Sequence, residues 1–153
     1  MYKQLLSAAL LLAPLPVMAQ DNWIVGSWSL VSAVQGDKDY MGPKPLGQLI
    51  FGPDGRFSNV LMRSDIPAFQ SGNRMTGTSD ENKAVVQGSI AYYGTYQVTG
   101  NTLKMHLVAS TYPNWNNTDQ TRMVHLVDGQ LSWENAAASA GGGGVKQMYE
   151  RNK

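Results

Sequence analysis

The chain has 153 residues, with 12 lysines and arginines, 11 aspartates and glutamates, and no cysteine. This length supports one domain with one hydrophobic core. The lack of cysteine excludes disulfides, thiolate metal sites and a lipid-modified cysteine. The near balance of charges argues against the basic surface that nucleic acids require, so no nucleic-acid partner is expected.

Residues 1–19 have the composition of a secretory leader. Lys3 precedes a short apolar run, and Val17-Met18-Ala19 fits the small-x-small rule for signal cleavage. The run is shorter than the ~18–20 residues that span a bilayer, so no stable membrane anchor is expected. We predict cleavage near Ala19 and a mature domain at 20–153. Export without disulfides favours a periplasmic or secreted bacterial protein.

From residue 26 onward the chain reads as short runs of strand-forming residues separated by turn residues. The turns Pro53-Asp54-Gly55, Thr99-Gly100-Asn101 and Asp128-Gly129 each lie between two such runs, which predicts three hairpins. The final run, residues 145–152, closes the chain. About eight antiparallel strands are therefore predicted, joined mainly to their sequence neighbours as in an up-and-down barrel.

Two stretches do not fit the strand pattern. Residues 78–92 begin with Thr78 or Ser79 as a possible N-cap and continue with acids and then apolar residues, which predicts one short helix serving as a lid or a plug. Residues 136–144 end in four glycines, including 141–144, and are expected to form a flexible rim loop. A phosphate cradle is disfavoured there because no strand-to-helix context surrounds the glycines.

A closed barrel would remove the open edges of such a sheet, and its interior would be packed with side chains or hold one small ligand. Side chains two residues apart share a face of a strand. The alternation groups Arg122 with Val124 and Leu126, and His106 with Val108 and Ser110. Both faces of several strands are partly apolar, so the alternation does not decide which face is internal.

The sequence resembles the bacterial and fungal lipocalin-like domain family across residues 23–152. The resemblance is carried by Gly26-Ser27-Trp28, by Tyr-x-Gly-x-Tyr at 92–96, and by Pro-Asn-Trp at 113–115 followed by Asp119-Gln120 and Arg122. It implies a calycin-type β-barrel able to hold a small hydrophobic molecule. Asn117 stands where the family tends to have glycine, and asparagine tolerates a left-handed backbone. At the closed end of such a barrel, Arg151 is positioned to stack on the Trp28 indole.

Seven residues are candidates for contact with a ligand, and five of them have competing interpretations. Tyr92 and Tyr96 either donate their hydroxyls into the pocket or fill the core of the barrel. Trp115 either lines the barrel mouth or packs on the rim. Arg122 either meets a ligand anion or faces solvent or an internal ion pair. His106 either orients a ligand, or acts as a general base if the protein is an enzyme, or makes only structural hydrogen bonds. The full set is Asn59, Arg63, Tyr92, Tyr96, His106, Trp115 and Arg122.

Three functions are compatible with these residues. The first is an exported barrel that binds or carries a small hydrophobic or amphiphilic molecule. The second is a cofactor-free isomerase or cyclase in the same pocket, with His106 as acid or base and Arg122 stabilising negative charge. The third is a packed barrel that binds another protein. No metal or cofactor is predicted, because two histidines without nearby acid pairs do not have metal-site spacing.

Overall fold

The computed structural model describes residues 22–137 and 141–153, so the predicted leader and three residues of the glycine-rich stretch lie outside the described residues. The described part contains nine strands and one α-helix. The strands are β1 (Gly26–Gln35), β2 (Lys38–Asp39), β3 (Leu46–Phe51), β4 (Arg56–Met62), β5 (Ser89–Thr99), β6 (Thr102–Ser110), β7 (Thr118–Val127), β8 (Gln130–Asn135) and β9 (Val145–Arg151). The helices are η1 (Asn22–Ile24), η2 (Arg74–Thr76), α1 (Ser79–Gly88) and η3 (Pro113–Trp115).

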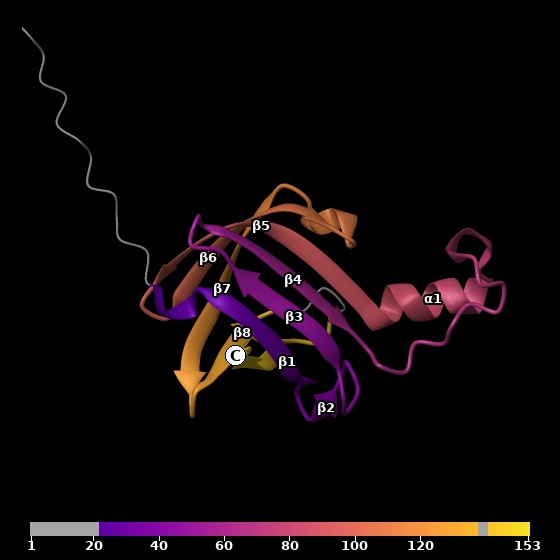
Figure 1. Cartoon of the computed structure of the whole chain (residues 1–153), viewed down its shortest axis with the longest axis horizontal. Helices are drawn as coiled ribbons and strands as arrows, with labels where there is room; N and C mark the ends of the chain where they lie inside the picture. The colour runs from indigo at the N-terminus through magenta and orange to yellow at the C-terminus, as the bar shows by residue number, and fades with distance from the viewer. Residues whose placement is uncertain (1–21, 138–140) are drawn as a thin grey trace, which may run out of the picture.

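The strands form one antiparallel sheet that closes on itself (Figure 1). From β3 to β9 each strand pairs with the next one in the chain, and β1 pairs with both β3 and β9. The two-residue β2 adds only a short edge to β1. The predicted up-and-down barrel of about eight strands is therefore confirmed.

The two ends of the barrel differ in their connections. At one end β3–β4, β5–β6 and β7–β8 are joined by the three predicted hairpin turns. Gly55, Gly100 and Gly129 all have positive φ there, at 79°, 56° and 81°. At the opposite end lie the long connections, namely 40–45, 63–88, 111–117, and the described parts of the last one, 136–137 and 141–144. Tight turns leave little room at the first end, whereas the longer connections leave the second end open.

The end with the short turns is closed by Trp28 and the segment before it. Trp28 is fully buried, and its indole Nε1 donates a hydrogen bond of 2.9 Å to the Ile24 carbonyl. The Arg151 guanidinium carbon lies 4.0 Å from the centroid of the Trp28 ring. Arg151 also donates to the carbonyls of Val25 and Trp23, at 2.7 and 2.6 Å. The predicted stacking of Arg151 on Trp28 is thus confirmed.

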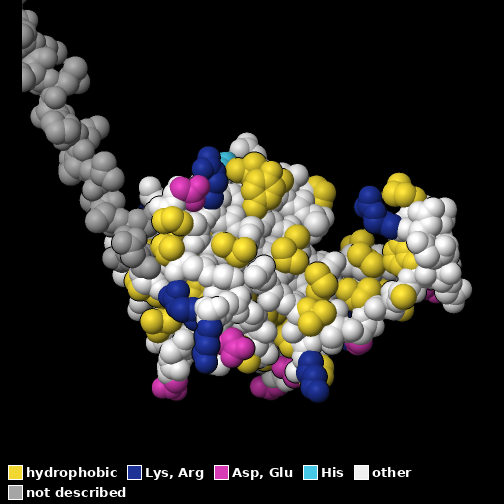
Figure 2. Space-filling model, in the orientation of Figure 1, with side chains coloured by type: hydrophobic (Ala, Val, Ile, Leu, Met, Phe, Trp, Pro, Cys, Tyr) yellow, Lys and Arg dark blue, Asp and Glu magenta, His cyan; other side chains and the backbone are white. Residues whose placement is uncertain are grey.

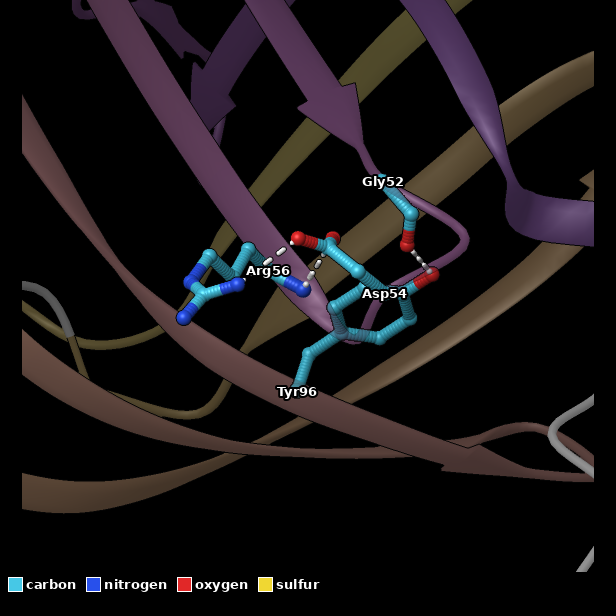
Figure 3. Close-up of polar contacts among 4 residues, drawn as sticks. All are labelled: Gly52, Asp54, Arg56 and Tyr96. Atoms are coloured by element: carbon cyan, nitrogen blue, oxygen red, sulfur yellow. Dashed lines mark hydrogen bonds and ion pairs between the residues drawn. The ribbon is translucent and has the colours of Figure 1, made fainter.

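The β3–β4 hairpin at the same end is tied to β5 by a tyrosine. The Tyr96 hydroxyl donates a hydrogen bond of 2.8 Å to the Gly52 carbonyl (Figure 3). Within the turn, an Asp54 carboxylate oxygen lies 2.9 Å from Nη1 of Arg56, and the other accepts from the Arg56 backbone N–H. Tyr96 therefore serves the closed end of the barrel in this structure.

The helix α1 does not plug the barrel. It belongs to an arm, residues 63–88, that connects β4 to β5 and projects away from the barrel beyond the ends of these strands (Figure 1). Thr78 is its N-cap, and Glu81 completes a capping box by accepting from the Thr78 N–H at 2.7 Å. Glu81 also accepts from the Gln70 N–H, which holds the preceding loop against the helix. Figure 2 shows hydrophobic side chains gathered where the arm joins the barrel.

None of the helices in residues 22–137 and 141–153 has the length and apolar character needed to cross a bilayer.

Candidate functional site

A cavity of about 570 Å³ lies inside the barrel at the end with the long connections. This size falls within the range of small-molecule sites, roughly 300–1,000 Å³. Its wall is mainly apolar, and the apolar side chains come from seven elements or loops, one of which is α1. They include Met41, Leu61, Ile90, Trp115, Trp133 and Val145.

Trp115 lines the cavity, and hydrogen bonds within the surrounding turn hold the residue in place. The Thr118 hydroxyl donates to the Trp115 carbonyl at 2.7 Å, and the Asn116 side chain accepts from the Ser110 N–H. Asn117 has a φ of 56°, the left-handed conformation expected for it. The Trp115 ring packs edge-on against Tyr92, with centroids 5.4 Å apart. The passage is therefore a turn and also a wall of the cavity.

A chain of hydrogen bonds runs through the barrel interior to the cavity. The Asn59 amide donates to the hydroxyls of Tyr92 and Tyr149, at 2.9 and 3.2 Å. The Tyr149 hydroxyl donates to Gln147, and the Gln147 amide donates to the Tyr40 hydroxyl at 2.6 Å. Tyr92, Gln147 and Tyr40 line the cavity, whereas Asn59 and Tyr149 lie beneath it. Polar groups buried in an apolar core thus obtain partners.

Burial keeps these phenols protonated well beyond neutral pH. Burial raises the pKa of Tyr92 to about 12, although the positive charge of Arg122 and the hydrogen bond with Asn59 lower it. Burial likewise raises the pKa of Tyr149 well above its ordinary value, and raises that of Tyr40. At physiological pH, Tyr40 and Tyr92 therefore present neutral hydroxyl groups to the cavity.

Tyr92 should make the stability of the protein fall in alkaline solution. An unfolded tyrosine loses its proton near pH 10, whereas folded Tyr92 retains it to about pH 12, so the free energy of unfolding falls as pH rises between these values. We expect Tyr92→Phe to reduce this fall by about 1.4 kcal/mol per pH unit. Urea unfolding from pH 9 to 12 measures it. Tyr93→Phe is the matched control, because Tyr93 is 52% exposed, and equal slopes for both variants would contradict the expectation.

Arg122 is a buried cation that forms no ion pair with any described residue. The residue is 5% exposed and lines the cavity. Its Nη1 donates to the Thr121 carbonyl at 2.9 Å, and its Nη2 donates to the Gln120 side chain. No carboxylate among the described residues lies within ion-pair distance of it, and its buried Nε has no acceptor there. Burial lowers the pKa of Arg122, yet the group stays charged because arginine titrates far above neutrality.

The cavity and its barrel agree with a comparison of the sequence with known families. Residues 25–147 match the lipocalin-like domain family, which is most of the chain. The chain belongs to that family. No curated protein matches it.

Two solved structures resemble this lipocalin-like domain. One is a lipocalin-like protein from Bacteroides uniformis, 17% identical with a TM-score of 0.45, in a match covering 84% of this chain and 98% of the other. The second is an uncharacterized protein from Bacteroides eggerthii, also 17% identical with a TM-score of 0.43, covering 84% and 99%.

The structure brings three of the seven candidate residues of this lipocalin-like domain to the cavity wall, namely Tyr92, Trp115 and Arg122. A fourth, Asn59, lies directly beneath it and bonds Tyr92.

The remaining candidates lie elsewhere. Tyr96 holds the hairpin at the closed end. Arg63 lies at the base of the arm, where it pairs with Asp65 at 2.6 Å. His106 lies on the outer face of β6, opposite the buried Met105 and Leu107, and its Nδ1 lies 2.9 Å from the Asp119 carboxylate.

Tyr40 and Gln147 are among the polar residues of the cavity wall that the sequence reasoning missed, and both belong to the chain of hydrogen bonds. Gln147 has a weak signal, since it alternates with the apolar Val145 and Tyr149 and so shares their inward face. Tyr40 lies in a polar loop, where its only distinguishing sequence feature is the apolar residue next to it, Met41. Within the described part of the chain, no three potential metal ligands gather.

Proposed function

We propose that this lipocalin-like domain binds or carries a small hydrophobic or amphiphilic molecule in its barrel cavity. The observation that carries the proposal is the mainly apolar cavity of about 570 Å³ inside the barrel, at the end where the long connections meet. Burying an apolar ligand there removes its surface from water, at about 25 cal/mol per Å² of apolar area.

Export is part of the same proposal. The leader composition of residues 1–19 supports it, although those residues lie outside the described part of the chain. A periplasmic or secreted location would place the cavity where a carrier meets molecules that dissolve poorly in water.

The alternative of an isomerase or cyclase assigned its proton transfer to His106. That side chain lies on the outer face of the barrel, 43% exposed, and pairs with Asp119. The alternative of a protein-interaction module assumed an interior packed with side chains, whereas the cavity leaves room for a ligand. The binding proposal is therefore the one that the geometry supports best.

The test uses the exported protein and a neutral fluorescent probe, N-phenylnaphthylamine. The N-terminal residue of the purified protein should be Gln20, and the probe should bind with a stoichiometry of one. Ile90→Trp places a large ring at the cavity wall and should weaken binding by at least about tenfold. Ile50→Trp, on the exposed face of β3, is the matched control and should leave binding unchanged. Absence of probe binding, or equal effects of both variants, would count against the cavity as a binding site.

A further inference from the structure

The charge in the described cavity wall is positive. Arg122 is the charged side chain in the cavity wall, and no aspartate or glutamate of the described residues joins it there. A buried cation normally requires a partner of opposite charge, because removing it from water is costly. The mainly apolar wall thus carries a positive charge, and none of the described residues in that wall carries a negative one.

Several hydrogen-bond donors in the cavity wall have no acceptor among the described residues. Arginine has five N–H donors, and the protein supplies acceptors for two of those of Arg122, on Thr121 and Gln120. The Tyr92 hydroxyl accepts from Asn59, and no acceptor for its own hydrogen is found in the described ranges. The same is true of Tyr40, which accepts from Gln147. A ligand that supplies acceptor atoms would accept hydrogen bonds from these donors.

Arg122 and Tyr92 lie in one region of the wall. Trp115 touches both, since its ring lies 5.4 Å from that of Tyr92 and 5.9 Å from the Arg122 guanidinium carbon. The apolar part of the wall continues from the same tryptophan to Ile90 and Leu61. The polar and apolar parts of the wall therefore suit the two ends of one elongated molecule.

We infer that the ligand is a monoanionic amphiphile, of the carboxylate class, whose acidic group lies beside Arg122 and accepts a hydrogen bond from Tyr92. One cation balances one negative charge. A phosphate monoester would bring nearly two charges and leave an excess of negative charge in an apolar wall. This inference rests on the proposed function and adds the charge of the ligand to it.

The test compares two dyes that differ by one charged group. Anilinonaphthalene sulfonate is N-phenylnaphthylamine with an added sulfonate, which is a monoanion. We expect Arg122→Met to weaken binding of the sulfonate dye about 10- to 100-fold more than it weakens binding of the neutral dye. Arg74→Met is the matched control, because Arg74 is exposed in the arm, and it should affect neither dye.

A second measurement needs no variant and so does not depend on the folding of Arg122→Met. Decanoate should displace the neutral dye from the unmodified protein at a concentration at least about tenfold below that of decanol. Equal displacement by the acid and the alcohol, or equal weakening of both dyes by Arg122→Met, would overturn the inference while leaving the cavity as a binding site. Failure of the neutral dye to bind would instead reject the proposed function, and the inference with it.

Discussion

Replacing Trp28 by alanine should lower the free energy of unfolding by about 3–5 kcal/mol. Trp28 is fully buried at the closed end of the barrel, so its removal leaves a cavity beneath η1. It also removes the ring on which Arg151 stacks and the donor that satisfies the Ile24 carbonyl. Because native domains are stable by only about 5–15 kcal/mol, this loss is a large part of the total. Urea unfolding of the variant and of the unmodified protein measures it.

A double-mutant cycle separates the stacking from the packing. Trp28→Ala, Arg151→Met and the double variant should give a coupling energy of about 0.5–2 kcal/mol for the cation and the ring. The neutral dye should still bind the folded Trp28→Ala variant, because Trp28 does not line the cavity. A cost below about 1 kcal/mol for Trp28→Ala would show that this end contributes little to stability.

The turns could be predicted from the sequence because each depends on local chemistry. Asp128 and Gly129 both have positive φ, at 52° and 81°, which is the two-residue hairpin geometry that Asp-Gly favours. Thr78 caps α1 for an equally local reason, since its hydroxyl accepts from the Glu81 N–H. The order of the strands then follows, because short turns leave each strand beside its neighbour. That is why the barrel could be anticipated without any contact being known.

The inward faces were harder to predict, and the reason differs from strand to strand. On β6 the buried face carries Leu103, Met105 and Leu107, and the more polar face, with His106, turns outward. On β7 the buried pair is Arg122 and Val124, so an arginine occupies an inward position. Hydrophobic alternation identifies the inward face of β6, whereas on β7 it groups Arg122 with Val124 without deciding whether their face is internal. Because arginine is rarely buried without a partner, the residue type itself argues against an inward position.

The projection of α1 from the barrel was not predicted either. The sequence gives the helix a cap and an apolar side, but these features do not state what the apolar side packs against. In the structure the last turn of α1 contributes Val85 and Val86 to the edge of the cavity, while the arm extends outward. Val86 is 76% exposed. Position relative to the barrel is a tertiary property, and local signals carry no information about it.

At Gly94 the strands β5 and β6 approach closely, and the alternation of residues along β5 does not predict this approach. It lies between Tyr92 and Tyr96 on the inward face of β5, where the sequence suggests a gap in the face. The gap is filled by the backbone of β6, whose register with β5 shifts between Tyr93 and Gly94. A Cβ on Gly94 would lie 1.9 Å from the His106 carbonyl oxygen and 3.1 Å from the Leu107 Cα.

Gly94→Ala should therefore destabilise the protein by about 3 kcal/mol, the upper end of the usual cost of overpacking. The clashing atoms belong to the neighbouring backbone, so no side-chain rotation can relieve them, and β5 must separate from β6. That separation would also move Tyr92 away from Asn59 and weaken binding of the neutral dye. Gly129→Ala is the matched control, because its φ is positive but its Cβ meets open space. It should cost about 1–2 kcal/mol and leave dye binding unchanged. Equal losses of stability for the two variants would mean that the barrel tolerates the extra methyl group at the register shift. Retained dye binding in both would mean that the spacing of β5 and β6 does not position Tyr92.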